Sequence, residues 1–307
     1  MTGLFFIVPL ALSSLHRKET MKKYLRLVKF SHTVFALPFA LLAFTLAVDF
    51  PGEGFSWYKL ILVLLCMVFA RNTAMGFNRW ADRNIDKLNP RTATREIPAG
   101  VVSVKEAGAF VVFNALLFII AAFMINMLCG FLAPVALAVV MGYSYTKRVT
   151  PLCHMVLGLG LALAPVGAWL AVTGAFDALP VLLGLVVLFW VSGFDIIYAL
   201  QDIEFDREHD LRSIPSWLGA ERALNVARIF HVISAAGLLL LGMSMLARYP
   251  ETSWISWIGI FAFIGLLIYQ HTQVKADDLS KVDLAFFTSN GVGSIVLGGL
   301  IILDHLI

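Results

Sequence analysis

The chain has 307 residues, of which 60% are hydrophobic and 14% charged, and its mean hydropathy is +0.85. An average soluble domain is about 45–50% apolar and about 25% charged, so this composition excludes an ordinary soluble protein and indicates a membrane protein. The formal net charge is only +3. No motif points to nucleic acid, haem or nicotinamide, and we expect no nucleic-acid partner.

Nine apolar segments follow one another along the chain, each long enough to cross a lipid bilayer. A spanning helix needs roughly 20 mostly apolar residues, and no soluble insert interrupts the series. We therefore predict an all-α membrane protein with one transmembrane domain over residues 21–307. The expected spans are 25–48, 58–78, 104–128, 131–147, 153–173, 179–200, 223–247, 253–272 and 284–304.

Residues 1–20 precede this domain. Their apolar run, 3–14, is short for a span and lacks the basic start of a secretory signal. Met21 then opens the segment Met-Lys-Lys-Tyr-Leu-Arg, which is typical of a cytoplasmic start. Two interpretations stay open: residues 1–20 are an extension from an upstream start site, or they form an interfacial segment on the bilayer surface.

The orientation in the membrane follows from the distribution of Lys and Arg. If the N-terminus lies in the cytoplasm, only Lys59 and Arg248 of the 23 basic residues fall on the outer side. Basic residues gather in cytoplasmic loops, so this asymmetry predicts the topology. We expect an integral protein of a bacterial inner membrane, with the N-terminus and the loops after even-numbered spans in the cytoplasm.

A polar motif ends the second expected span, where Asn78, Asp82 and Asp86 follow at four-residue spacing. Residues four apart are neighbours on one helix face. Carboxylate and amide oxygens suit Mg²⁺, which takes one or two carboxylates plus the phosphates of a substrate. The spacing alone leaves two interpretations: a metal site, or a solvated helix end that pairs with Arg79 and Arg83.

A second motif of the same kind ends the sixth expected span. Tyr198, Asp202, Asp206 and Asp210 share one helix face by the same spacing. Asp195 lies one turn earlier in an otherwise apolar segment, where an ionisable group costs ~2.5–3.5 kcal/mol on insertion scales and marks a functional site by default. The alternative is a neutral Asp195 with a structural role.

The two motifs together are stronger evidence for a functional site than either one alone, because both face the cytoplasm in the predicted topology. Facing carboxylates repel each other unless cations stand between them, and Mg²⁺ ions that bridge to a diphosphate supply such cations. A diphosphate is the leaving group of an electrophilic alkyl transfer. We predict a site for Mg²⁺ and a lipid diphosphate, whose expected metal ligands are Asn78, Asp82, Asp86, Asp202 and Asp206.

Basic side chains on the same side are candidates for contact with the phosphates. Lys147 and Arg148 follow the fourth expected span, and Arg91 and Arg95 lie in the loop after the first motif. Arg83, between the two aspartates of that motif, is a further catalytic candidate. The alternative for Lys147 and Arg148 is that they only anchor the topology.

Four segments, taken together, match the pattern of one protein family. They are Asn78…Asp82…Asp86 with Asn89-Pro-Arg-Thr-Ala-Thr-Arg-Glu-Ile-Pro-Ala-Gly100, Tyr198…Asp202…Asp206, Tyr143-Ser-Tyr-Thr-Lys147-Arg148, and Lys29-Phe-Ser-His32-Thr-Val-Phe-Ala-Leu-Pro38. They resemble the UbiA superfamily of intramembrane prenyltransferases, and the likeness covers nearly all of residues 21–307. The resemblance implies nine transmembrane helices around a central cavity.

Within that superfamily the chain is most similar to the 4-hydroxybenzoate polyprenyltransferases of ubiquinone synthesis and to their relatives in the futalosine route to menaquinone. The resemblance implies Mg²⁺-dependent transfer of a polyprenyl group from polyprenyl diphosphate to an aromatic acid. Those enzymes commonly have Arg-Pro-Leu-Pro-Ser-Gly after the first motif, whereas this chain has Arg95-Glu-Ile-Pro-Ala-Gly100. The departure leans slightly towards the futalosine-type acceptor.

The resulting hypothesis gives roles to the remaining candidates. Tyr198 orients a phosphate or stabilises the allylic cation through its ring face, and Asp195 orients Tyr198 or a basic residue. His32 is a weaker candidate. Two alternatives stay open: a prenyltransferase that acts on another ring, such as a porphyrin or a homogentisate-like acid, and a cation-coupled transporter, since acidic residues in membranes also mark ion pathways.

Overall fold

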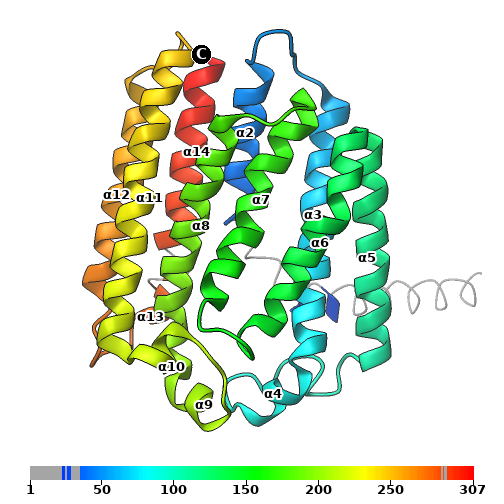
Figure 1. The fold of residues 1–307 in the computed structure, drawn as a ribbon, viewed down its shortest axis with the longest axis vertical. Helices are drawn as coiled ribbons and strands as arrows, with labels where there is room; N and C mark the ends of the chain where they lie inside the picture. The colour runs from blue at the N-terminus through cyan, green and yellow to red at the C-terminus, as the bar shows by residue number, and fades with distance from the viewer. Residues whose placement is uncertain (1–22, 25, 29–34, 285, 287–288) are drawn as a thin grey trace, which may run out of the picture.

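A computed structural model describes residues 23–307 except 25, 29–34, 285, 287 and 288. The described residues form a bundle of long helices that run roughly side by side, with short helices gathered at one end (Figure 1). No strand occurs among them, and the only β-type pairing is an isolated bridge between Lys275 and Asp278. The predicted all-α class is confirmed. His32 and the proposed extension 1–20 lie outside the described residues.

Seven helices in the described part of the chain are long and apolar enough to cross a membrane. Each overlaps one of the expected spans, with ends that differ by a few residues. They are α3 (Trp57–Ala81), α5 (Val104–Ile125), α6 (Met127–Thr146), α7 (Cys153–Thr173), α8 (Ala178–Ala199), α11 (Ala220–Arg248) and α12 (Trp254–Gln273).

The first and ninth expected spans correspond to two shorter apolar helices, α2 (Leu37–Val48) and α14 (Asn290–Leu306). At 1.5 Å per residue, the 17 residues of α14 extend about 26 Å, less than the ~30 Å of a bilayer core. Part of the first expected span lies outside the described residues. The count of nine membrane-spanning helices is therefore not confirmed.

Local polar signals set several helix ends. Ser103 and Glu106 form a capping box at the start of α5, and Asn126 and Asp177 cap the first turns of α6 and α8. Such side chains accept hydrogen bonds from backbone N–H groups that the helix itself leaves unpaired. Gly174 ends α7 in the left-handed conformation, at φ 65°.

The core lies around α8, which packs between α7 and α11. Trp190, at the middle of α8, is fully buried, and its ring meets those of Phe39 on α2 and Phe263 on α12. Its indole N–H donates to Asn290 of α14 at 2.9 Å. This pairing satisfies the indole, which would be costly to bury alone.

The outer faces of the bundle carry large exposed apolar side chains, among them Phe113, Phe131, Val232 and Ile268. A soluble monomer rarely exposes so many large apolar side chains. These faces suit contact with lipid acyl chains.

The short helices α4 (Arg83–Leu88), α9 (Ile203–Glu208) and α10 (Ile214–Leu218) lie together at the end of the bundle opposite the C-terminus (Figure 1). α4 continues from α3, and α9 continues from α8 through the 3-10 turn Leu200–Asp202. Both acidic motifs are therefore at the same end of the bundle, as the alternation of spans predicts.

Candidate active site

The first motif sits where α3 passes into α4. The sequence predicts one continuous helix, but the structure divides it at Asp82, whose φ and ψ are −89° and 4°. The backbone bonds still run from Asp82 to Asn78 and from Asp86 to Asp82. Asn78 Nδ2 donates to Asp82 Oδ2 at 3.1 Å, so these two share a face as expected. Asp82 and Asp86 are only 2% and 3% exposed.

The second motif has the same construction at the end of α8. Its helix is interrupted at Asp202, whose φ and ψ are −109° and 8°. Asp206 is buried and accepts a hydrogen bond from the Ser213 hydroxyl at 2.8 Å. Asp210 does not join the group: it lies beyond the end of α9, exposed and in the left-handed conformation at φ 53°.

A polar cavity of about 170 Å³ lies between the two motifs. All four expected aspartates line it, together with Asn78, Tyr198 and Asp195. The structure thus brings together residues that stand more than a hundred positions apart in the sequence. Its other polar lining residues are Asn89, Arg91, Thr92, Arg95, Tyr143, Ser144, Lys147, Cys153, His154 and Ser213.

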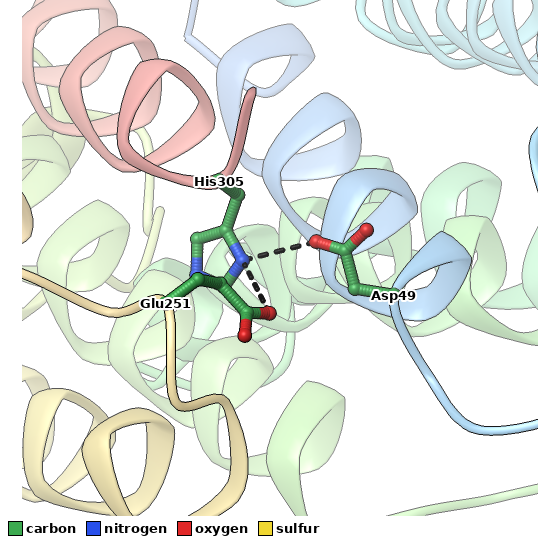
Figure 2. Close-up of side chains that lie close together, drawn as sticks. All are labelled: Asp49, Glu251 and His305. Carbon is green, nitrogen blue, oxygen red and sulfur yellow. Dashed lines mark hydrogen bonds and ion pairs between the residues drawn. The ribbon is translucent and has the colours of Figure 1, made fainter. Parts of the chain in front are cut away.

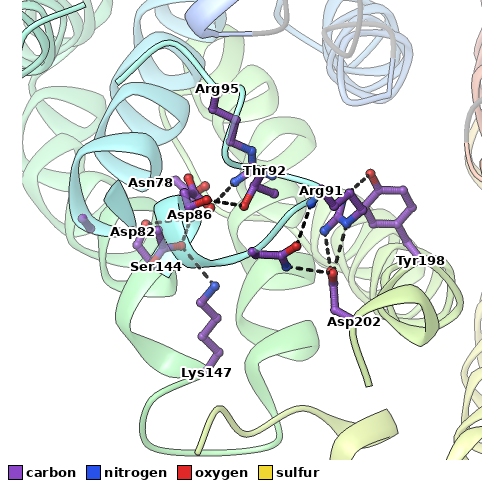
Figure 3. Close-up of polar contacts among 12 residues, drawn as sticks. Asn78, Asp82, Asp86, Arg91, Thr92, Arg95, Ser144, Lys147, Tyr198 and Asp202 are labelled. Atoms are coloured by element: carbon purple, nitrogen blue, oxygen red, sulfur yellow. Dashed lines mark hydrogen bonds and ion pairs between the residues drawn. The ribbon is translucent and has the colours of Figure 1, made fainter. Parts of the chain in front are cut away.

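Basic side chains form ion pairs with the two aspartates of the first motif (Figure 3). Asp82 is flanked by Lys147 Nζ at 3.3 Å and Arg148 Nη2 at 3.0 Å, both from the end of α6. Arg95 Nη1 lies 2.6 Å from Asp86 Oδ1. Buried carboxylates need such partners, because an unpaired charge is costly away from water.

Arg91 connects the loop to the second motif (Figure 3). It forms a two-pronged ion pair with Asp202, in which Nε lies 3.0 Å from Oδ1 and Nη2 contacts Oδ2. Nη1 donates to the Tyr198 hydroxyl at 3.1 Å, and Asn89 Nδ2 donates to Asp202 at 3.2 Å. Burial alone would lower the pKa of Arg91, but its bonds to Asp202 outweigh it and raise that pKa above the ordinary value.

One carboxylate oxygen of Asp86, a residue of the cavity wall, has no hydrogen-bond partner among the described residues. Asp86 Oδ2 is buried and makes no hydrogen bond within the described part of the chain, although Oδ1 is paired with Arg95. An unpaired buried acceptor calls for an explanation such as a bound ion. An oxygen-rich wall with one free carboxylate oxygen fits a hard divalent cation such as Mg²⁺.

Asp195 is held by a histidine that no sequence motif marks. His154 Nδ1 lies 2.7 Å from Asp195 Oδ2, and the backbone N–H of Ile214 donates to His154 Nε2 at 3.3 Å. Because Nε2 accepts that bond, the ring proton of the neutral imidazole is on Nδ1 and is donated to Asp195. The chain Ile214–His154–Asp195 therefore orients this carboxylate towards the cavity.

Among the described candidates, Arg83 points away from the acidic motifs, whereas Arg148 contacts Asp82 without lining either cavity. The Arg83 guanidinium donates to the Trp80 carbonyl at 2.7 Å and lies 4.9 Å from the centre of the Trp80 ring. It does not line the polar cavity or the apolar chamber that adjoins it. Because the helix is interrupted at Asp82, the Arg83 side chain points in a different direction from those of Asp82 and Asp86.

The structure also shows where Glu96 and Ile97 lie, the two residues at which the loop departs from the usual family motif. Ile97 is buried in a small cluster with Leu27, Val102 and Ala107. Glu96 and Ile97 line neither space. The departure therefore changes packing at the base of α5 and does not contact the space available to substrates.

The adjoining apolar chamber has a volume of about 400 Å³. Its walls come mainly from α3, α6, α7 and α8, with residues such as Met67, Ala136, Ala164 and Val191. Polar and apolar spaces meet at residues that line both: Asn78, Arg95, Tyr143, Asp195 and Tyr198.

A bundle of membrane helices with a charged cavity at one end of an apolar chamber is suited to hold an amphiphilic anion. The UbiA prenyltransferase family model matches residues 36–291. The chain belongs to this family and is a membrane prenyltransferase. The family assignment favours the enzyme over the alternative of a cation-coupled transporter.

Relatives of known name and structure agree with this assignment. The chain is 29% identical over 240 residues to a 4-hydroxybenzoate octaprenyltransferase of Aliivibrio fischeri, which covers 78% of this chain and 82% of the relative. The apo structure of a UbiA homolog from Aeropyrum pernix K1 has a TM-score of 0.78 and 32% identity, with 89% and 98% of the two chains covered. A UbiA homolog from Archaeoglobus fulgidus bound to GPP and Mg²⁺ has a TM-score of 0.74 and 23% identity, with 93% and 100% covered.

Proposed function

We propose that this protein transfers a polyprenyl group from a polyprenyl diphosphate to an aromatic acid in quinone biosynthesis. The first acceptor to test is 4-hydroxybenzoate, because curated relatives are named for it. The naphthoate of the futalosine route is the second, since the motif departure that favours it does not reach the cavity. The product would enter ubiquinone or menaquinone synthesis, respectively.

The contact between the two cavities is the observation that supports this function most directly. A prenyl diphosphate has a highly charged head and an apolar tail, and the two spaces offer one compartment for each. The bond that breaks during transfer joins the head to the tail. It would therefore lie at the shared boundary, beside Tyr198 and Asp195.

The four aspartates, assisted by Asn78, would hold Mg²⁺. The lone Oδ2 of Asp86 and the oxygen-rich wall support this assignment. Bound there, Mg²⁺ would neutralise charge on the departing diphosphate. Proteins of this fold accept such ligands, as the Archaeoglobus fulgidus homolog with GPP and Mg²⁺ illustrates.

The basic residues would exchange partners when the substrate enters. Lys147, Arg148, Arg91 and Arg95 are paired with the aspartates in the structure. A diphosphate offers them oxygens of higher charge, and Arg forms two-pronged bonds to phosphate as readily as to carboxylate. The freed carboxylates would then be available as metal ligands, so both changes favour the same bound state.

The transfer itself breaks the allylic C–O bond, and the electron pair leaves with the diphosphate. Charge stabilisation of the leaving group by cationic side chains lowers this barrier. The Tyr198 ring, on the chamber boundary, can stabilise the developing allylic cation. The aromatic ring forms the new C–C bond and then loses a proton, for which Asp195 is the acceptor at the boundary.

Conversion of a radiolabelled prenyl diphosphate by the purified protein tests this function. With Mg²⁺ and 4-hydroxybenzoate or a naphthoate acceptor, we expect a labelled prenylated acid. Asp82→Ala and Asp202→Ala should each lower the rate at least ~100-fold, since each removes a ligand of the Mg²⁺ that would neutralise the leaving group.

Asp210→Asn is the matched control, because Asp210 belongs to the same row of acids but lies outside the cavity. Its rate should stay within about twofold of the parent, since Asn also tolerates the left-handed conformation. Full activity in Asp82→Ala and Asp202→Ala would disprove the site assignment. A panel with other rings, including a porphyrin and a homogentisate-like acid, identifies the acceptor class.

A further inference from the structure

A second group of ligand-type side chains, drawn in Figure 2, lies at the end of the bundle that holds the C-terminus, opposite the short helices with the acidic motifs (Figure 1). Asp49 directly follows α2, Glu251 lies in the loop between α11 and α12, and His305 is in the last turn of α14. Three separate segments thus bring one imidazole and two carboxylates together. Neither cavity of the prenyltransferase site includes any of them.

The spacing of these atoms is that of a metal coordination shell. His305 Nδ1 lies 3.0 Å from Asp49 Oδ2 and 3.6 Å from Glu251 Oε1. The three ligand atoms all lie within 4.8 Å of one another. A tetrahedral ion with bonds of about 2.1 Å places its ligands roughly 3.4 Å apart. Small side-chain movements would therefore bring all three atoms onto one ion.

Burial differs between the ring and the acids in a way that suits ion entry. The His305 side chain is 0% exposed, whereas those of Asp49 and Glu251 are 27% and 42% exposed. His305 Nε2 is buried without a hydrogen-bond partner among the described residues, so Nδ1, which faces the two acids, is the only polar anchor of the ring. An ion from solvent can therefore reach the two carboxylates, which contact that nitrogen.

The last turn of α14 is itself held firmly. Asp304, next to His305, is buried and accepts hydrogen bonds from the backbone and hydroxyl groups of Ser253 and Ser256 at the start of α12. The Tyr249 ring packs edge-on against His305, 5.3 Å between centres. Such supporting contacts position a metal ligand before the ion binds.

The basic residues at this end are engaged elsewhere. Lys59 donates to the Val172 carbonyl at 2.6 Å, and Arg248 pairs with Asp177 at 2.7 Å. Among the described residues, no Lys or Arg forms an ion pair with Asp49 or Glu251. Their two negative charges therefore meet only an imidazole, and a divalent cation would neutralise them.

We infer that Asp49, Glu251 and His305 form a binding site for one divalent transition-metal ion, with Zn²⁺ as the best match to one imidazole and two carboxylates. Imidazole nitrogen favours Zn²⁺ over Mg²⁺ and Ca²⁺, which prefer oxygen ligands alone. Three protein ligands leave a position for water. The bound ion would tie α2 and α14 to the α11–α12 loop.

Zinc retention by the full-length protein in detergent tests the site. The acidic cavity is first disabled by Asp82→Ala and Asp202→Ala, so that Zn²⁺ bound there does not count. After chelator treatment, addition of Zn²⁺ and desalting, we expect one retained zinc per chain and a rise of several degrees in the thermal unfolding midpoint, because the ion binds the folded state.

Added to this background, His305→Gln should lose the retained zinc and the rise in midpoint. Glu251→Gln, at a half-exposed position that folding tolerates, should weaken zinc retention at least tenfold. Asp177→Asn is the control: it breaks an ion pair at the same end of the bundle but leaves the three ligands intact, so the zinc response persists. Equal zinc retention in the parent, His305→Gln and Glu251→Gln, or none in the parent, would overturn the inference. In the otherwise native protein, His305→Gln should leave prenyl transfer within about twofold.

Discussion

At the residue scale, the contact between His154 and Asp195 distinguishes this site from a simple pair of acidic motifs. A carboxylate at the chamber boundary is useful only if it keeps one orientation. The 2.7 Å bond from His154 supplies that orientation, and the backbone of α10 fixes the tautomer of the ring. We therefore propose that His154 acts through Asp195, as a positioning residue.

Substitution of His154 tests this role. His154→Ala should lower kcat by roughly 10- to 100-fold, at or below the lower end of the ~10²–10⁴-fold that general acid–base catalysis contributes, because Asp195 itself remains. The KM for the prenyl diphosphate should change little, because the aspartates and basic residues that hold the head remain. His154→Asn, whose amide can replace the Nδ1–H donor, should recover part of the loss. Parallel changes in kcat and donor KM would indicate a general structural defect instead.

The residues that sequence reasoning finds and misses have a common explanation. The aspartates and Tyr198 repeat at helical spacing, so their shared faces are readable from local sequence. His154 and Ser213 carry no such pattern and gain their roles from partners elsewhere in the chain, Asp195 and Asp206. Sequence reasoning predicts Arg83 at the site only because it lies between Asp82 and Asp86 in the sequence. The interruption of the helix at Asp82 turns its side chain away from the cavity.

At the element scale, α7 connects the polar site to the depth of the chamber. His154 is in its first turn, and Gly167 lies thirteen residues later, about 20 Å further along the axis. Gly167 lines the chamber, and a Cβ at this position would meet no atom within 4 Å. A larger side chain here would occupy space in the chamber without a clash against the bundle.

Gly167→Leu should therefore shift the preference of the enzyme towards donors with shorter prenyl chains. We expect kcat/KM for long polyprenyl diphosphates to fall at least tenfold, and that for geranyl diphosphate to stay within about threefold. Only a tail that reaches this depth meets the new side chain. Poor fit of such a group in an apolar pocket costs on the order of 1–3 kcal/mol of binding free energy. The comparison requires only a series of donors of increasing length.

Gly265→Leu is the matched control for this experiment. Gly265 lies on α12 and does not line the chamber, and a Cβ added there would likewise meet no atom within 4 Å. The same change of residue type in a helix should leave the donor preference unaltered. An equal loss for short and long donors in Gly167→Leu would contradict the proposed direction of the tail.

At the scale of the whole molecule, all the short helices with the acidic motifs lie at one end, and the three-ligand group lies at the other (Figure 1). The proposed orientation puts the acidic end in the cytoplasm. Two exposed positions report on the two ends: Asp277, in the loop after α12, and Phe176, in the turn between α7 and α8.

Labelling with a membrane-impermeant maleimide tests this orientation. In intact cells, Phe176→Cys should react, whereas Asp277→Cys should react only after the membrane is permeabilised. The asymmetry of basic residues is the physical reason, because Lys and Arg resist transfer across the membrane. The parent protein, with Cys66, Cys129 and Cys153, provides the background. The reverse labelling pattern would invert the orientation without changing the fold.

Local sequence was enough to predict the all-helical membrane class, seven of the spans and the two acidic motifs at a common end. Hydropathy and four-residue spacing are local properties, and the bilayer acts on them segment by segment. Helix packing, in contrast, decided which cation faces which aspartate, that His154 holds Asp195, how the apolar chamber meets the charged cavity, and that Asp49, Glu251 and His305 converge. These features depend on contacts between residues far apart in the chain, and such contacts exist only once the helices have packed.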